Sequence, residues 1–377
     1  MKIEQKKFSA LDGWETIRKD DFNASDSDFV IAFGSKDLLE DSSFYNDLRI
    51  LYPIACIIMN STAGEIIDTY VYDETIVLTA IKFSNTKLET SSVNISSQPN
   101  SFEAGCYLAN QLNQENLKSV FVISDGQLVN GSELVIGLQS IFPLNTIITG
   151  GLAGDGARFH STLVGLNEAP KKGMIVVIGF YGTLNVNFGC VGGWDSFGPE
   201  RIITKSKANV LFELDGKPAL DIYKKYLGEQ AKDLPGSALL YPLSIRMKDS
   251  QDSLVRTILN INEEEKSLIF AGNMPEGNYA RLMKANLDRL IEGSSNAAQK
   301  SLQIDAPELA ILISCVGRKL VLDQRIEEEV EVIRSVYGKK TAITGFYSYG
   351  EIAPSFTVDK CELHNQTMTI TTFTEEE

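Results

Sequence analysis

Apolar and polar stretches follow one pattern three times along the chain, in residues 29–66, 119–156 and 308–352. Each copy begins with a short run of β-branched and apolar residues, which predicts a buried strand. A polar loop follows, and then an amphipathic segment with helical spacing. A second apolar run closes the copy and ends in a glycine-containing turn. This repetition predicts that each copy contributes the same strand, helix and strand to the fold.

The three closing turns have related sequences, STAGEI at 61–66, GLAGDG at 151–156 and YSYGEI at 347–352. In each turn a glycine immediately precedes an acid, and we expect that glycine to supply a positive φ angle or a close backbone approach. Hairpin-like strand patterns come after each turn. The repeated unit is therefore predicted to be strand, helix, strand and hairpin.

These elements predict an α/β (α+β) layered fold, with mixed β-sheets flanked by helices and two domains. Residues 102–113 and 279–298 are expected to be helical connectors, and PALDIYKKYLG in the middle stretch is expected to be a helix with proline at its first turn. The boundary falls near Gly216. The predicted divisions are an N-terminal extension (1–27), a first domain (28–215), a second domain (216–373) and a solvated acidic tail (374–377).

Charge and composition limit the function classes. The 377 residues include 35 basic and 50 acidic side chains, a net charge of -15, which repels nucleic acids and anionic membranes. No apolar run approaches the roughly 18 residues of a membrane helix, and no secretory signal is recognisable. The five cysteines are scattered without a CxxC pair, so we expect a reducing cytoplasm and neither disulfides nor structural zinc. Only two histidines are present, which argues against a Ser-His-Asp hydrolase.

Several motifs in order resemble one family over residues 29–372. The first half contains MNSTAGEI, ISDGQLVNGSELVIGL, TGGLAGDG and ELDGKPALDIYKKYLG, and the second contains YPLSI, LVRTILNI, AGNMPEG, ISCVGR, GFYSYGEI and HNQTMTI. These segments are similar to the FIST N and FIST C domains of the FIST (F-box and intracellular signal transduction) family.

The resemblance implies a sensory protein that binds a small ligand, with amino acids as the proposed class. Family members often carry kinase, cyclase, chemoreceptor or F-box segments, which are not recognisable here. We therefore expect a stand-alone, non-enzymatic member that relays its signal to a separate protein such as a kinase or cyclase. Some members are similar to haem-based nitric oxide sensors, so haem binding is an alternative to a chain without a cofactor.

Three carboxylates, Glu65, Asp155 and Glu351, occupy the matching turn positions. Either they accept hydrogen bonds from a ligand amino group, or they cap nearby backbone N–H groups. Glu351 is the first candidate because Tyr347 and Tyr349 flank it, and aromatic walls are typical of small-molecule pockets. The GGLAGDG segment has the wrong glycine order for a dinucleotide motif and lacks the Walker lysine, so we interpret it as a tight turn at a strand end.

Arg318 follows a predicted buried strand directly. It could clamp a ligand carboxylate through paired hydrogen bonds, or form an ion pair with an acid such as Glu351. If the clamp holds, Arg318→Ala should abolish ligand binding and leave the fold largely intact. Arg256 and Arg246 are weaker candidates of the same kind, and Arg246 is better explained by surface solvation. Asn365, in HNQTMTI, completes the expected ligand-binding set.

Cys315 could be a nucleophile only with a base beside it, and a buried structural cysteine is the favoured interpretation. His364 or His160 would ligate iron if haem were bound; no other metal site is expected. His364 lies in an alternating strand pattern and is expected to face solvent. Trp194 is expected to cover a pocket or the domain seam. The remaining alternatives are a ligand-free interaction scaffold and an enzyme that uses Cys315 or the carboxylates.

Overall fold

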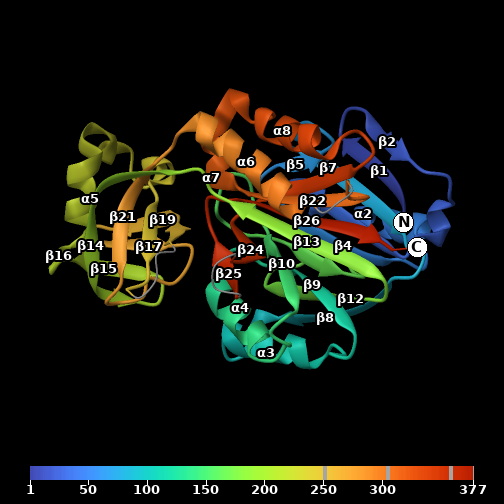
Figure 1. Ribbon diagram of the computed structural model, residues 1–377, viewed down its shortest axis with the longest axis horizontal. Helices are drawn as coiled ribbons and strands as arrows, with labels where there is room; N and C mark the ends of the chain where they lie inside the picture. The colour runs from blue at the N-terminus through green and yellow to red at the C-terminus, as the bar shows by residue number, and fades with distance from the viewer. Residues whose placement is uncertain (249–252, 303–305, 356–359, 377) are drawn as a thin grey trace.

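The computed structural model describes residues 1–248, 253–302, 306–355 and 360–376. Figure 1 shows a large body joined to a smaller lobe. The body contains three six-stranded sheets built from residues 1–194 and 285–376, and the lobe contains one eight-stranded sheet built from residues 195–284. The predicted class, layered mixed sheets with helices in two domains, is confirmed.

Each sequence repeat forms the centre of one body sheet. Its first and second strands pair in parallel, a helix connects them, and a third strand pairs antiparallel with the first. The first unit consists of β3 (Phe29–Gly34), α2 (Ser43–Leu51), β4 (Cys56–Ser61) and β7 (Thr75–Lys82). The second consists of β9 (Leu117–Ser124), α4 (Gly131–Gln139), β10 (Ile147–Leu152) and β12 (Met174–Tyr181). The third consists of β22 (Leu309–Cys315), α8 (Glu328–Tyr337), β23 (Ala342–Ser348) and β26 (Met368–Glu375).

The three units exchange one strand each in a closed cycle. After its glycine–acid turn, β5 (Glu65–Ile67) leaves the first sheet and pairs with β23 of the third. In the same way β24 (Gly350–Pro354) pairs with β10 of the second sheet, and β11 (Val164–Leu166) pairs with β4 of the first. The second strand of each unit therefore pairs with a strand from another repeat, so the three units form one interlocked body.

Further elements extend these sheets. Strand β1 (Lys2–Ser9) lies between β7 and β2. Sheet-edge positions are taken by β2 (Gly13–Lys19), β6 (Tyr70–Tyr72), β8 (Lys87–Asn94), β13 (Leu184–Val191) and β25 (Cys361–His364). The remaining body helices are α1 (Lys36–Leu39), α3 (Ser101–Asn110), α6 (Leu287–Ser301) and α7 (Val316–Leu322). Because β1 pairs along its whole length with β7, the segment expected to be an N-terminal extension is part of the first sheet.

The apolar strands bury both of their faces. In β3, Phe29, Ile31 and Phe33 belong to a central core that the three sheets share, whereas Val30 and Ala32 pack toward the α2 side. In the second unit, Phe121 and Ile123 enter the same central core. This burial on both faces explains why the sequence shows continuous apolar runs at the parallel strands.

The lobe has its own apolar core, which includes Ile203, Leu211, Tyr223 and Phe270. Its elements are β14 (Asp195–Lys207), β15 (Val210–Leu214), β16 (Lys217–Pro218), α5 (Ala219–Leu227), β17 (Leu243–Arg246), β18 (Ser253–Arg256), β19 (Ile258–Asn262), β20 (Ser267–Phe270) and β21 (Tyr279–Lys284). The helix predicted for PALDIYKKYLG is confirmed as α5. The helix expected from residue 279 is wrong in its first part, because residues 279–284 form β21 and the helix α6 begins only at Leu287.

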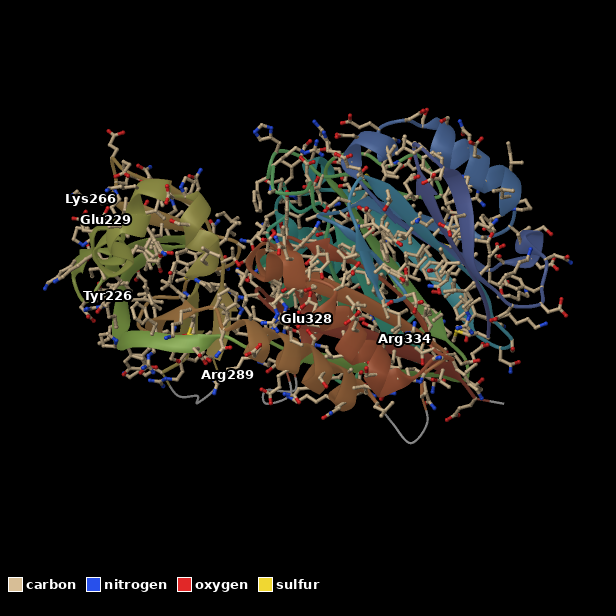
Figure 2. All side chains as sticks on the ribbon, turned by 90° about the horizontal axis from the view of Figure 1, so that it is seen from above. Tyr226, Glu229, Lys266, Arg289, Glu328 and Arg334 are labelled. Atoms are coloured by element: carbon tan, nitrogen blue, oxygen red, sulfur yellow. The ribbon has the colours of Figure 1, made fainter. Side chains whose placement is uncertain are left out.

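Two adjacent chain segments join the lobe to the body. Strand β14 enters the lobe after Trp194, and β21 leaves it toward α6; Asp195 and Lys284 are paired where the two strands lie together. Arg289 of α6 forms an ion pair with Asp195, and Figure 2 shows Arg289 near this junction. Trp194 donates a 3.0 Å hydrogen bond from Nε1 to the Gln366 carbonyl and belongs to an apolar cluster with Met283 of the lobe and Leu290 of α6, so it lies at the seam between lobe and body.

Glu375 is held by the fold, which corrects the expected solvated tail at this residue. Glu375 is the last residue of β26 and accepts hydrogen bonds from the backbone N–H groups of Ser84, Asn85 and Thr86. The amino group of Met1 lies 3.3 Å from the Glu375 carboxylate. Met1 and Glu375 are therefore fixed to the body at one place.

Candidate functional site

The three glycine–acid turns meet within the body. The Ala63 N–H donates to the Tyr347 carbonyl and the Tyr347 N–H to the Gly64 carbonyl, both at 2.8 Å. The Gly154 N–H donates to the Ser61 carbonyl at 2.9 Å. Gly64 has a φ of +138°, and a Cβ on Gly154 would lie 2.7 Å from the Ala63 nitrogen. The positive φ and the close approach expected of these glycines are both present.

Two of the three turn acids share one buried arrangement. Glu65 accepts hydrogen bonds from the hydroxyls of Thr62 and Thr75, and Glu351 accepts them from Ser348 and Thr367. In each case one hydroxyl lies three residues before the acid and the other lies on the following hairpin. Burial raises the pKa of Glu65 to about 7 and that of Glu351 to about 8, although these hydroxyls act in the opposite direction. This geometry matches the local-capping interpretation.

The acid of the second turn has different partners. Asp155 is buried and forms a 2.5 Å ion pair with Arg158, which also binds Asp37. Leu152 occupies the position that carries a hydroxyl in the other two turns. The three turns are therefore equivalent in backbone position, but their carboxylates face different surroundings.

Arg318 is fully buried and pairs with Glu329 of α8, so the ion-pair alternative is realised with a different acid from the one expected. Its Nε and Nη2 donate to Glu329 Oε2 at 3.1 and 2.8 Å. Further donations reach the carbonyls of Gly192 and Leu290. A ligand carboxylate at Arg318 would have to displace Glu329, so Arg318→Ala is now expected to damage the fold.

Three further candidates are enclosed by the third unit. Tyr347 is fully buried and donates to Glu329 Oε1 at 2.6 Å. Cys315 is buried, and its thiol pKa is raised by that burial, which disfavours the reactive thiolate. Asn365 is also buried, and neither of its side-chain amide atoms has a hydrogen-bond partner among the described residues.

The two histidines occupy contrasting positions. His364 is buried rather than solvent-facing, its Nε2 lies 3.0 Å from the Ala353 carbonyl, and burial lowers its pKa to about 4. That contact occupies Nε2 and leaves Nδ1 as the ring nitrogen that an iron would need. His160 is exposed, in the loop after the second turn.

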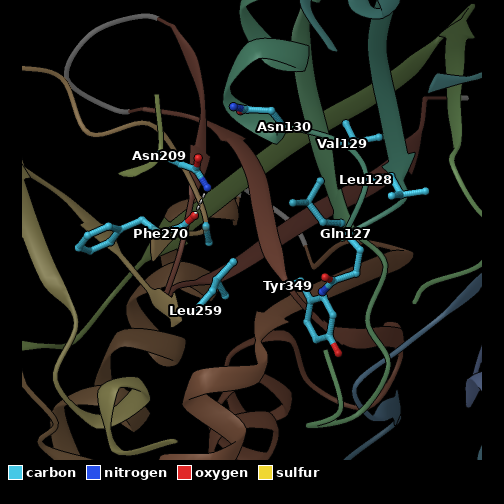
Figure 3. Close-up of a pocket in the computed structure, with 11 residues that line it drawn as sticks. Gln127, Leu128, Val129, Asn130, Asn209, Leu259, Phe270 and Tyr349 are labelled. Carbon is cyan, nitrogen blue, oxygen red and sulfur yellow. Dashed lines mark hydrogen bonds between the residues drawn. The ribbon is translucent and has the colours of Figure 1, made fainter. Parts of the chain in front are cut away.

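A cleft runs between the lobe and the body, and we call it the interlobe cleft. It consists of two cavities, of about 620 and 250 Å³, which adjoin at Leu259 of β19. The smaller is lined by residues 126–130 and Tyr349 of the body, and by Asn209, Phe270 and Ala271 of the lobe (Figure 3). The body residues follow the carboxyl end of β9, the edge where open α/β sheets place ligands.

The larger cavity has mainly apolar walls. Phe159 and Leu320 of the body face Leu239, Leu240 and Ile258 of the lobe. Phe159 stacks on Tyr349 with ring centroids 4.6 Å apart, and the Tyr349 hydroxyl receives the Phe159 N–H. This pair forms a wall between the two cavities. Among the residues that line the cleft, the described ionisable groups are Asp233 and Tyr349, and no lysine or arginine is included.

Arg256 lies elsewhere on the seam. It lines a separate cavity of about 290 Å³ with Ser132 and Asn273, and donates to the Leu363 carbonyl at 2.7 Å. Arg246 pairs with Glu200 and stacks over Tyr279 on the lobe surface, in line with the surface role expected for it.

Of the predicted ligand-binding residues, the structure therefore places Tyr349 in the interlobe cleft and Arg256 in a second pocket. It places Glu65, Asp155, Cys315, Arg318, Tyr347, Glu351 and Asn365 within packed parts of the body. Sequence reasoning missed Phe159, Leu259 and Leu320. The available signal was an apolar side chain next to a predicted turn or strand end, which is too common to single out a pocket.

The family assignment rests on the two domain matches. Residues 28–217 match the FIST N domain, and residues 219–354 match the FIST C domain. The chain belongs to the FIST family. FIST domains are associated with sensory and signal-transduction roles and do not form a known enzyme family. The junction between the two matches lies inside the lobe, just before α5, so both FIST domains contribute strands to the lobe and to the body.

An uncharacterized protein of Methanocaldococcus jannaschii is 25% identical over 275 residues, which are 65% of this chain and 51% of that protein. The chain thus spans about half the length of this curated relative. No helix in the described part of the chain is long and apolar enough to cross a bilayer. The described residues contain no group of three or more His, Cys, Asp or Glu side chains arranged to hold a metal ion.

Proposed function

We propose that this FIST protein is a sensor that binds a small metabolite in the interlobe cleft and relays binding to a separate signalling protein, such as a kinase or cyclase. The observation that carries the proposal is the cleft itself. Its larger cavity, about 620 Å³, falls within the size range of small-molecule sites and lies between two structural units, where such sites commonly occur.

The walls of the cleft favour a ligand that is mainly apolar. Leu128, Leu240, Leu259 and Leu320 remain between 36 and 60% exposed, although they line a shared hollow. Gathered exposed apolar side chains mark binding surfaces. The amides of Gln127 and Asn130 provide polar groups at one end, and Asp233 provides a negative charge. Amino acids with apolar side chains are the first members of this class to test.

A ligand in this position could change the placement of the lobe. The body supplies one wall of the cleft and the lobe supplies the other, and two chain segments join these two parts. A ligand that contacts both walls would favour the arrangement in which they are closest, by the difference in its affinity for the two arrangements. A partner that recognises the lobe surface would then read the bound state. We place this activity in the cytoplasm, on the strength of the five unpaired cysteines.

A thermal-shift screen tests the proposal. The panel contains the amino acids and haemin, each added to the purified protein. A ligand at about 100 times its Kd adds roughly 2.7 kcal/mol to the folded state. For a chain of this length, that corresponds to a rise in Tm of roughly 3 °C. We expect such a rise with a chemically related group of apolar amino acids.

Leu259→Trp supplies the blocking variant, because its side chain lines both cavities of the cleft. Leu11→Trp is the matched control at a 96% exposed position in the β1–β2 turn. The shift should disappear in the first variant and persist in the second. A shift with haemin alone, together with a sharp absorption band, would replace the proposal with the haem alternative. No shift with any member would favour the scaffold alternative over an amino-acid sensor.

A further inference from the structure

A second pocket on the seam contains a buried guanidinium, and the acid that acts on it electrostatically, Glu362, lines the same cavity without forming an ion pair with it. Arg256 of β18 is 6% exposed, and among the described residues it donates one hydrogen bond, from Nη1 to the Leu363 carbonyl. It forms no ion pair with a described carboxylate, and its Nε has no partner. A buried guanidinium is stabilised by a nearby anion, so this arrangement is half of a site.

The other half lies on the body, at the start of α4. Ser132, in the first turn of that nine-residue helix, is buried, and its hydroxyl has no hydrogen-bond partner among the residues that the structure describes. Helix N-termini attract anions, because their first N–H groups lack partners within the helix. The hydroxyl and the guanidinium therefore offer donors to the same cavity from opposite sides of the seam.

Gly272 lies beside both donors. A Cβ at this position would lie 2.9 Å from Arg256 Nε and 3.0 Å from Ser132 Oγ. The two atoms are therefore within about 6 Å of each other, and a side chain at residue 272 would crowd both of them. Two donors at this spacing can be reached by the two oxygens of one carboxylate.

We propose that this cavity, the Arg256 pocket, binds a monocarboxylate with an apolar tail and that the carboxylate bridges Arg256 of the lobe and Ser132 of the body. The cavity holds about 290 Å³, and Val135, Ile136, Leu254 and Leu363 form apolar walls beyond the donors. The charged residues of the described lining are Arg256, Lys360 and Glu362, a balance that suits a monoanion better than a dianion such as phosphate. The site is distinct from the interlobe cleft and does not depend on the ligand proposed there.

Isothermal titration with 4-methylpentanoate, and with its uncharged amide, tests the inference on the full chain. We expect the carboxylate to bind roughly 10- to 100-fold more tightly than the amide, as hydrogen bonds to charged groups require. Arg256→Met should weaken carboxylate binding by a similar factor without lowering the Tm, because it also removes a buried charge. Gly272→Ala should do the same while keeping the arginine, because its Cβ would crowd both donors. Arg201→Met is the control and should bind like the wild type, because Arg201 is a half-buried lobe arginine that is paired with Asp215 and does not line the Arg256 pocket.

Five results would overturn the inference, four of them single observations. These four are no detectable carboxylate binding at 10 mM, equal binding of acid and amide, wild-type binding by Arg256→Met, and tighter binding of inorganic phosphate than of the carboxylate. Loss of binding in Leu259→Trp together with full binding in Arg256→Met would also overturn it, and would place the probe in the interlobe cleft instead. A failure of the cleft screen with retained carboxylate binding would contradict the proposed function alone.

Discussion

Arg318 is expected to be a structural residue, and its replacement by methionine measures how much the body depends on it. The guanidinium is fully buried and joins α6, α7 and α8 through Leu290, Ser294 and Glu329. In Arg318→Met the Glu329 carboxylate stays buried without its positive partner. Breaking one half of a buried ion pair costs about 3–5 kcal/mol, which for 377 residues is a fall in Tm of roughly 4–6 °C.

Differential scanning calorimetry at pH 7 provides the assay. Arg325→Met is the matched control, because Arg325 pairs with Glu328 and Asp288 on the surface and should change the Tm by less than about 1 °C. The double variant Arg318→Met with Glu329→Gln removes both charges and should recover part of the lost Tm. Equal Tm values for Arg318→Met and the control would refute this reasoning and would restore Arg318 as a residue free to meet a ligand.

Three further predictions concern the turns and the chain ends. Glu351 has a folded-state pKa of about 8, above the ordinary 4.5, so the native state holds an extra proton between these pH values and stability falls as pH rises through this window. In Glu351→Gln the free energy of unfolding should fall less steeply with pH, by at most about 1.4 kcal/mol per pH unit, as measured by denaturant titrations at several pH values. An unchanged pH dependence would contradict this assignment. Gly154→Ala should destabilise the body by about 1–3 kcal/mol, because its Cβ would clash with Ala63. Gly192→Ala is the control, since a Cβ at that position makes ordinary contacts. Equal Tm values for the two variants would contradict the tight packing at Gly154. Burial alone would raise the pKa of Glu375, but hydrogen bonds from residues 84–86 outweigh it and hold the pKa at about 2. The Glu375 carboxylate therefore stabilises the folded state above about pH 4.5, and this stabilisation is lost toward pH 2. Glu375→Gln should lower the Tm at pH 7 and have little effect near pH 2.

The repeated unit could be predicted from the sequence because each strand, helix and turn has a local signature. The runs at residues 29–34, 119–124 and 309–315 are mostly apolar at consecutive positions rather than at alternate ones, which is the pattern of strands buried on both faces. The cyclic exchange of β5, β11 and β24 could not be predicted. These strands are three to five residues long, and their partners are set by packing among repeats far apart in the chain.

The candidate site was predictable only in part. Tyr349 was found because an aromatic residue beside a turn at a strand end is a recognisable signal. The partner of Arg318 was missed, because Glu329 lies in an amphipathic helix where an acid usually faces solvent. The lobe wall of the cleft, with Leu240 and Leu259, carries no motif at all. Its position follows from how the lobe meets the body, which no local pattern encodes.

The most direct test of the central claim is the affinity of the panel member with the largest thermal shift, measured by isothermal titration for the wild type, Leu259→Trp and Leu11→Trp. Because Leu259 lines both cavities, the account predicts that its replacement weakens the Kd at least about tenfold, corresponding to about 1.4 kcal/mol, and that the control leaves it unchanged. Equal affinities for all three proteins would contradict a ligand site in the interlobe cleft.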